Sequence, residues 1–143
     1  MMTKAGGKSM AQIEIADHIA GCIKKYGDKL AALLELPASL LVDVARNQPI
    51  ASQVPGVYVI LSPLDVRVVY AGKTNDQGHI CRRMQDHRSG NASRDLPVML
   101  QHHQDLVQDI DQYQVKWIEI QDPRDRYYFE QFMTGVLRPI LNG

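Results

Sequence analysis

Apolar residues in the first third of the chain recur at helical spacing. Residues 9–25 carry them three and four positions apart, which predicts an amphipathic helix that begins at a capping serine and ends at Gly27. Two shorter helices are predicted at residues 29–36 and 37–46, the second with a proline in its first turn. None of these helices has a basic face, which disfavours a helix-turn-helix reader. We expect residues 9–50 to be a structural extension or, through their apolar stripes, the surface of a homodimer.

The pattern changes to that of β-strands after Pro55. Residues 56–61 are an unbroken apolar run, and residues 67–72 are rich in β-branched side chains. The turn between them, Ser62-Pro63-Leu64-Asp65, is too short for a helical crossover, so the two strands should pair antiparallel. Residues 114–120 alternate between apolar and polar and predict a third strand.

Helices are predicted between and after these strands. The apolar spacing places them at residues 79–88, 96–111 and 123–137, and Asp122 followed by Pro123 is a good start for the last one. The predicted fold class is therefore α+β, a small three-stranded antiparallel sheet flanked by helices. Residues 1–8 are expected to be a disordered lead-in, residues 9–50 an N-terminal helical extension, and residues 54–143 the domain that holds the sheet.

The 16 basic and 16 acidic residues balance, so the net charge is zero. Tight non-specific binding of nucleic acid depends on many phosphate contacts, and a neutral chain is a weak candidate for it. The charges are not spread evenly, because five bases between positions 73 and 94 face only two acids: Lys73, Arg82, Arg83, Arg88 and Arg94 against Asp76 and Asp86. A locally basic face that binds nucleic acid therefore stays open as a hypothesis.

Neither a membrane span nor a disulfide is expected. No run approaches ~20 consecutive apolar residues, the length that crosses a bilayer. The two cysteines, Cys22 and Cys81, form no spaced pattern with histidines. We interpret them as reduced thiols of a cytoplasmic protein.

The candidate chemistry lies in six residues: Tyr58, Tyr70, Lys73, Arg83, His87 and Glu130. Hydrolysis of a phosphodiester needs a base near water, cations on the phosphate oxygens and a group that neutralises the departing alkoxide. An arginine binds two phosphate oxygens at once, and a lysine beside a tyrosine lowers the pKa of the phenol. A lone carboxylate on an apolar helix is costly unless it is paired or binds a metal, and oxygen ligation suits Mg²⁺ or Mn²⁺. We expect Arg83 to be an exposed cleft residue that contributes little to folding.

Each of these residues also has a plainer interpretation. Tyrosines on strands usually pack, and neighbouring arginines on a helix are usually solvated. Glu130 is one helical turn from Arg126 and is close enough in sequence to pair with it. His79, at a helix start, is more often a cap than a phosphate ligand. Adjacent helical residues point apart, so we interpret His102 and His103 as surface or packing residues.

The order and spacing of the candidate residues resemble those of the GIY-YIG nuclease family. Gly56-Val57-Tyr58 is similar to the first tripeptide of that family, and Tyr70-Ala71-Gly72 is similar to the second, with Lys73-Thr74 following as in many members. Val57 and Ala71 replace the usual isoleucines, a change that repacking of the sheet interior should tolerate.

Later residues extend the resemblance to about residues 54–142. Arg83-Met84-Gln85-Asp86-His87 resembles the family's helix motif, and Glu130 stands in the late helix where the family keeps its metal-binding glutamate. Pro139 and Asn142 match its closing proline and asparagine. Residues 54–143 would then be a GIY-YIG-like nuclease domain.

The resemblance implies a metal-dependent endonuclease that hydrolyses DNA, with RNA as an alternative, and leaves a 5′-phosphate and a 3′-hydroxyl. In that scheme Tyr58 takes a proton from the attacking water, with help from Lys73, and Tyr70 orients the phosphate or its water. Arg83 holds the nonbridging oxygens, and His87 supports the nucleophile side. Glu130 holds one divalent cation, Mg²⁺ or Mn²⁺, and Asn142 buttresses the site. The residues expected to bind nucleic acid are Lys73, Arg82, Arg83, Arg88 and Arg94.

Two classes of function follow from these observations. Because the polar set is complete, we expect an active enzyme of the restriction, repair or genome-defence type. The alternative, which the neutral charge favours, is a non-catalytic nucleic-acid-binding or protein-interaction module that keeps the fold.

Overall fold

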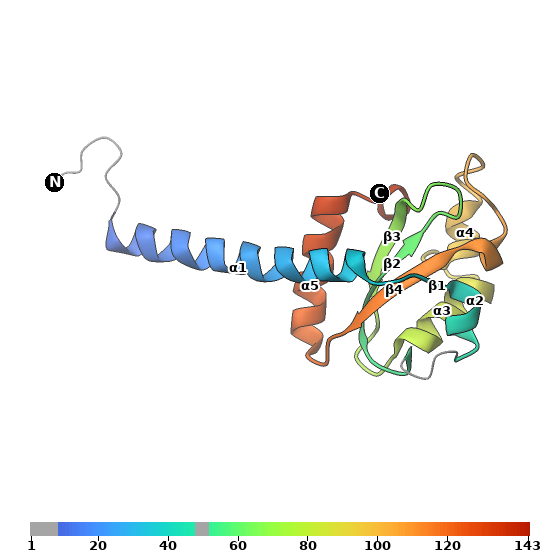
Figure 1. Cartoon of the computed structure of the whole chain (residues 1–143), viewed down its shortest axis with the longest axis horizontal. Helices are drawn as coiled ribbons and strands as arrows, with labels where there is room; N and C mark the ends of the chain where they lie inside the picture. The colour runs from blue at the N-terminus through green and yellow to red at the C-terminus, as the bar shows by residue number, and fades with distance from the viewer. Residues whose placement is uncertain (1–8, 48–51) are drawn as a thin grey trace. The chain divides into compact units, whose positions relative to one another are not determined.

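The computed structural model describes residues 9–47 and 52–143 (Figure 1). The chain divides into two compact units, one that ends at Ala32 and one that spans Leu33–Gly143. The lead-in predicted at residues 1–8 lies outside the described residues. No helix in the described ranges is long and apolar enough to cross a membrane.

Helix α1 (Met10–Glu35) begins as the sequence predicts and ends later. The Ser9 hydroxyl accepts from the backbone N–H of Gln12 at 3.1 Å, and the Gln12 side chain accepts from the backbone N–H of Ser9 at 2.9 Å. This reciprocal pair is a capping box. The predicted break at Gly27 is wrong. A glycine inside a helix costs about 1 kcal/mol relative to alanine, and apolar residues continue at helical spacing beyond it.

The fold class α+β is confirmed, but the sheet has four strands and not three. Its order is β1 (Ser39–Leu40), β4 (Gln114–Glu119), β2 (Gly56–Leu61) and β3 (Val68–Lys73), with every neighbouring pair antiparallel. The extra strand β1 pairs with the start of β4 and reduces the predicted helix at residues 37–46 to α2 (Leu41–Ala45). A strand of two residues is too short to show a period in the sequence.

The central strand β2 is buried along its whole length, with helices on both faces of the sheet. Side chains alternate along a strand, and Tyr58 and Ile60 belong to the core cluster formed with α2, α3 (Ile80–Ser89) and α4 (Leu96–Leu100). Helix α5 (Pro123–Leu137) lies on the other side (Figure 1) and buries Phe129 and Met133 completely. Tyr58 therefore points to the α3 side of the sheet.

Two predicted helix starts are confirmed by their caps. The His79 imidazole accepts from the backbone N–H of Arg82 at 3.2 Å, so this histidine is the N-cap of α3. The Asp122 carboxylate accepts from the backbone N–H of Arg124 at 2.9 Å at the start of α5. Helix α5 ends at Arg138, which has a left-handed backbone with φ 46°, and the short helix η3 (Ile140–Asn142) closes the chain.

The helix predicted at residues 96–111 is wrong over most of its length. Only α4 forms, and turns lead from it to the short helix η2 (Ile110–Gln112). The side-chain amide nitrogen of Gln108 lies 3.1 Å from each of the carbonyls of Leu100, His103 and Leu106, which share its two N–H groups. These bonds satisfy carbonyl groups that a continuous helix would have used itself.

Candidate active site

Most of the candidate residues surround one open cavity of about 400 Å³. Strand β3 supplies Tyr70 and Lys73, helix α3 supplies Arg83, and helix α5 supplies Glu130. Arg94, from the loop before α4, is the third basic residue of the lining, which also includes the carboxylates of Asp86 and Asp95. Residues that are up to 60 positions apart in the sequence therefore meet at a single surface.

Tyr58 lies behind this cavity and not in its wall. The side chain is fully buried, and its ring centroid is 6.2 Å from that of Tyr70 and 5.6 Å from that of His87. Gly72 is paired with Tyr58 across the sheet, and a Cβ at Gly72 would lie 2.6 Å from the Tyr58 hydroxyl. Only a glycine leaves room for the phenol at this position.

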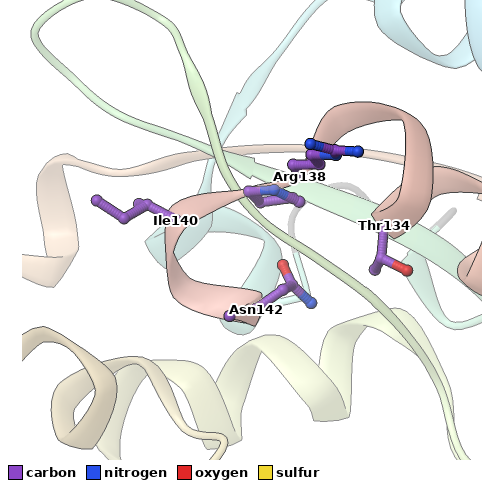
Figure 2. A pocket seen from close by; sticks show the side chains of 6 residues that line it. Thr134, Arg138, Ile140 and Asn142 are labelled. Carbon is purple, nitrogen blue, oxygen red and sulfur yellow. The ribbon is translucent and has the colours of Figure 1, made fainter.

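Asn142 fastens the end of the chain to the edge strand β3. Its amide oxygen accepts from the backbone N–H of Ala71 at 2.8 Å, and its amide N–H donates to the Ala71 carbonyl at 2.8 Å. Asn142 lies close to the C-terminal end of α5, near Thr134 and Arg138 (Figure 2). Ala71 follows Tyr70 directly, so this contact fixes the strand that presents the cavity tyrosine.

His87 is a buried neutral imidazole with a defined tautomer. Burial, and after it the charge of Arg83, lowers the pKa of His87 well below its usual value. Its Nδ1 accepts from the backbone N–H of Leu96 at 3.1 Å, so the ring proton is on Nε2. Nε2 lies 2.7 Å from the Tyr58 hydroxyl, to which it therefore donates.

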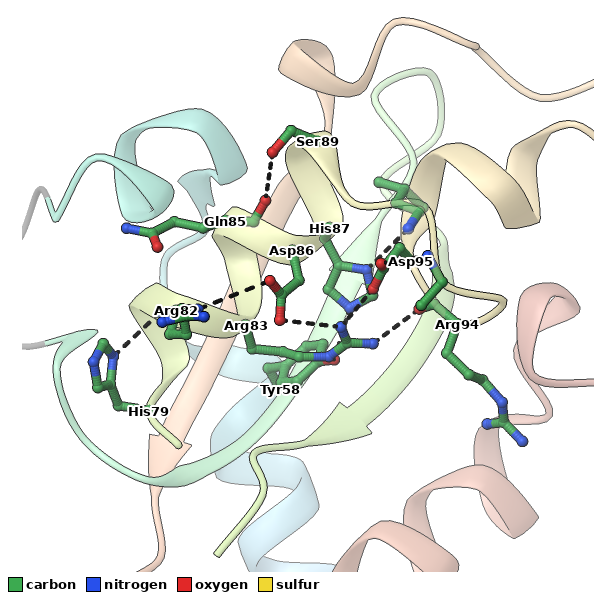
Figure 3. Close-up of polar contacts among 12 residues, drawn as sticks. Tyr58, His79, Arg82, Arg83, Gln85, Asp86, His87, Ser89, Arg94 and Asp95 are labelled. Carbon is green, nitrogen blue, oxygen red and sulfur yellow. Dashed lines mark hydrogen bonds and ion pairs between the residues drawn. The ribbon is translucent and has the colours of Figure 1, made fainter. Parts of the chain in front are cut away.

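The guanidinium of Arg83 donates three hydrogen bonds, and its Nη1 also lies 3.9 Å from the Asp86 carboxylate (Figure 3). Nε donates to the Tyr58 hydroxyl at 3.1 Å, Nη1 to the Asp95 carboxylate at 2.7 Å, and Nη2 to the Arg94 carbonyl at 2.9 Å. The Arg83 side chain is only 18% exposed and that of Asp95 only 7%. The expectation of an exposed arginine that contributes little to folding is therefore wrong, because Arg83 pairs with a carboxylate that is almost fully buried.

The pKa of Tyr58 is raised, not lowered. Burial is the main cause, and the positive charge of Arg83 opposes it. The cation that lowers the pKa of Tyr58 is Arg83, and not Lys73. The Tyr58 oxygen accepts from both Arg83 and His87, and at neutral pH it belongs to a neutral phenol.

Arg126 does not pair with Glu130. It is buried, and its Nη1 donates to the Thr74 hydroxyl at 2.8 Å and to the Asn75 carbonyl at 3.2 Å. The same hydroxyl accepts from the backbone N–H of Gly56 at 3.1 Å. Arg126 thus joins the helix that carries Glu130 to the end of the strand that carries Lys73.

Two of the five expected nucleic-acid-binding residues lie away from the cavity. Arg82 is 70% exposed and 3.9 Å from Asp86, and Arg88 donates to Asp111 at 3.0 Å. Lys73, Arg83 and Arg94 line the cavity.

Sequence reasoning missed Asp95 and Arg126. Asp95 precedes a short helix and so has the pattern of an N-cap. Its ion pair with Arg83 spans 12 positions, from helix α3 across the loop that follows it. In the sequence, Arg126 has the position expected of an exposed residue on the polar face of a helix. Neither contact has a local signal in the sequence.

Glu130 is the cavity residue that fits a hydrated divalent cation. Burial raises the pKa of its carboxyl, while the nearby charges of Lys73 and Arg94 lower it. Glu130 makes no ion pair with any described residue. In the described ranges no three His, Cys, Asp or Glu side chains gather in a way that could hold a metal. A single carboxylate suits Mg²⁺, which keeps several of its waters and takes the rest of its ligands from phosphate.

Comparisons with known proteins concern the fold. No family model matches the chain, and no curated protein matches it. Two solved structures are similar to it: the GIY-YIG N-terminal endonuclease domain of UvrC from Thermotoga maritima bound to magnesium, its catalytic divalent cation, and a point mutant of that domain bound to its catalytic divalent cation. Each has 15% sequence identity and a TM-score of 0.48, over 71% of this chain and 97% or 96% of the other.

Replacing Arg83 by alanine should destabilise the protein. The substitution leaves Asp95 buried without its partner, which costs roughly 3 kcal/mol. Arg82→Ala is the matched control, because its side chain is mostly exposed, and it should change the free energy of unfolding by less than about 0.5 kcal/mol. Urea denaturation followed by circular dichroism measures both. Equal stability of the two variants would contradict the buried pair.

The two site tyrosines should differ in their effect on stability. Tyr58→Phe removes the acceptor of two buried N–H donors, and each donor left unsatisfied costs roughly 1–3 kcal/mol. The Tyr70 hydroxyl has no hydrogen bond to any described residue, so Tyr70→Phe should cost less than about 0.5 kcal/mol. Thermal and urea unfolding of the two variants measures the free energy of unfolding of each. A larger decrease for Tyr70→Phe than for Tyr58→Phe would refute the assigned hydrogen-bond network.

Proposed function

We propose that this protein is a metal-dependent endonuclease that hydrolyses phosphodiester bonds of DNA. The observation that supports the proposal best is the single cavity shared by Tyr70, Lys73, Arg83, Arg94 and Glu130. It combines cations for a phosphate, a phenol for the attacking water and a carboxylate for a divalent cation. RNA presents the same phosphodiester and is the alternative substrate.

The phosphate would enter between the basic residues and the edge strand. Lys73 and Arg94 balance its charge from two sides of the cavity. Arg83 has five N–H groups, of which three are engaged with Tyr58, Asp95 and Arg94. The remaining two would donate to nonbridging oxygens, in competition with the Asp86 carboxylate 3.9 Å from Nη1. A group fixed in this way loses little entropy when a phosphate binds.

A proton must leave the attacking water during hydrolysis. In the resting protein Tyr70 lines the cavity, whereas Tyr58 is buried behind it with a raised pKa. We propose that Tyr70 orients the water. Tyr58 first releases its phenol proton to solvent, a loss that the positive charge of Arg83 favours, and the phenolate oxygen then takes the proton from the attacking water. Hydrolysis in this sense leaves a 5′-phosphate and a 3′-hydroxyl.

Glu130 would hold one Mg²⁺ or Mn²⁺ ion. Such an ion, when bound, stabilises the charge on the departing oxygen. The role of the chain is to keep the Glu130 carboxylate in place, which Arg126 does by tying α5 to Thr74. Asn142 holds strand β3 through two hydrogen bonds to the backbone of Ala71.

The cellular setting is also a proposal. Cys22 and Cys81 are both free thiols, which suits a reducing cytoplasm. Restriction, repair and genome defence are the settings that we propose for a DNA endonuclease of this kind.

The second candidate function is a binding module without catalysis. The observation that favours it is the commitment of Arg83 to Asp95, Tyr58 and the Arg94 carbonyl. If that network does not admit a phosphate, the cavity binds nucleic acid through Lys73 and Arg94 alone.

Cleavage assays separate the two functions. Labelled duplex, single-stranded and branched DNA, and a matched RNA, should be cut in the presence of Mg²⁺ or Mn²⁺ and left intact in EDTA. Glu130→Ala should lose at least about 100-fold in rate. Glu119→Ala removes an exposed carboxylate that lines none of the cavities described and should retain activity. Absence of metal-dependent cutting on every substrate would leave the binding module.

The exposed face of α1 supports a homodimer. Ile15, Ile19 and Ile23 follow one another at single helical turns and are 52–59% exposed. The helix carries four acidic and three basic residues, unlike the Lys- and Arg-rich helices that lie on membranes. We therefore propose that two chains associate through α1.

Sedimentation velocity of the full chain tests this association. The wild type should sediment as a dimer, and an Ile19→Glu/Ile23→Glu variant as a monomer, because two carboxylates would have to be buried. Leu64→Glu alters an apolar residue that is 79% exposed in the other unit and should remain dimeric. A monomeric wild type at all concentrations would remove the dimer.

A further inference from the structure

The cavity that holds Glu130 does not end there. A hollow of about 200 Å³ adjoins it and shares both Arg94 and Glu130 with it. Beyond this hollow, around Asn142, lie two larger ones of about 380 Å³ each. One is lined by Thr134 and Arg138 (Figure 2), and the other by Arg94, His102 and His103. The hollows together form a groove that leads away from the proposed scissile position.

The outer part of the groove is basic. The described residues that line the two larger hollows include Arg94, Arg138, His102 and His103 and no Asp or Glu. Arg94 and Arg138 form no ion pair with any described residue. The Arg94 side chain also points away from Arg83, to which it offers only its carbonyl (Figure 3). Two arginines are therefore available to an anion along this path.

The histidine hollow combines polar and apolar side chains. His102 and His103 line it together with Val98, Met99 and Leu141. Imidazole rings beside aliphatic side chains are a surface on which an unpaired base can stack. A base inside a duplex is already stacked on its neighbours, so this hollow would suit a nucleotide that is single-stranded or flipped out.

We propose that the groove binds an unpaired strand next to the scissile phosphate. Arg94, which lines both the cavity and the groove, lies where the strand passes from the scissile phosphate into the groove, and Arg138 binds a flanking phosphate, while a flanking base stacks in the hollow of His102 and His103. This inference rests on the proposed nuclease function and deepens it, because it selects single-stranded or locally unpaired nucleic acid as the substrate class. It also gives a role to two histidines that the sequence pattern left as surface residues.

The test is equilibrium binding of the full chain in EDTA, so that no cleavage takes place. The probes are a fluorescent thymidine hexanucleotide and the same strand with abasic positions. The wild type should bind the abasic strand with a Kd about tenfold higher than that for the intact hexanucleotide, because the stacked base is missing. The His102→Ala/His103→Ala variant should weaken binding of the hexanucleotide similarly but bind the abasic strand as the wild type does. His18→Ala, in α1, is the control and should have no effect.

The arginines are tested by salt dependence. Arg138→Asn removes the charge and keeps a residue that tolerates the left-handed backbone. It should lower the slope of log Kd against log salt by about one, the value for one lost phosphate contact. Arg124→Gln, at the other end of α5, should leave the slope unchanged.

Each outcome decides the proposal. If the His102→Ala/His103→Ala variant still binds the hexanucleotide about tenfold more tightly than the abasic strand, or if a duplex binds as tightly as the single strand, the unpaired-strand groove is refuted. If no oligonucleotide binds, the groove is also refuted. Neither result touches the hydrolytic function, which is measured separately by Glu130-dependent cleavage of a small phosphodiester such as bis(p-nitrophenyl) phosphate.

Discussion

The guanidinium of Arg83 is the constraint on which the site depends. It joins the central strand through Tyr58, the loop before α4 through Asp95, and the backbone of Arg94. A charged group that is so little exposed is tolerable only when its partner is in place, and the same is true of the Asp95 carboxylate. The helix, the strand and the loop therefore have to assemble together, and the back wall of the cavity follows from that assembly.

The site has a rigid rear and an open front. At the rear, the Tyr58 oxygen accepts from Arg83 and His87, and His87 accepts from the Leu96 backbone. Both ring nitrogens of His87 have a partner, which fixes the tautomer and the orientation of the ring. At the front, Tyr70, Lys73, Arg94 and Glu130 face the cavity. Rigid rear groups position the arginine, while the front groups remain able to adapt to a substrate.

Local patterns in the sequence predict the parts of the fold that local forces determine. The strands of the hairpin, the start of α5 at Asp122 and the cap at His79 are each specified by neighbours within a few positions. Strand β1 depends on a distant partner, β4, and the turns after α4 depend on the Gln108 amide. Contacts of this kind leave no periodicity, so they could not be predicted.

The candidate site divides in the same way. The cavity residues Tyr70, Lys73, Arg83 and Glu130 have the residue types that phosphodiester chemistry needs, so they could be selected from the sequence. Asp95 and Arg126 could not, because an aspartate before a helix and an arginine on a helix are common for other reasons. Whether Arg83 is free or paired is a property of the folded chain alone.

The edge position of β3 explains where the groove runs. An edge strand leaves one row of backbone groups without a neighbour, and on β3 the Asn142 amide satisfies both groups of Ala71 as a pairing strand would. The C-terminal segment therefore covers the edge beside Tyr70 and keeps it from pairing with another chain. It also contributes Asn142 to all three of the hollows beyond the cavity. Asn142 thus holds the β-strand that carries Tyr70 and also lines the hollows along which a substrate chain would leave the cavity. The placement of Tyr70 is therefore coupled to the path of the substrate.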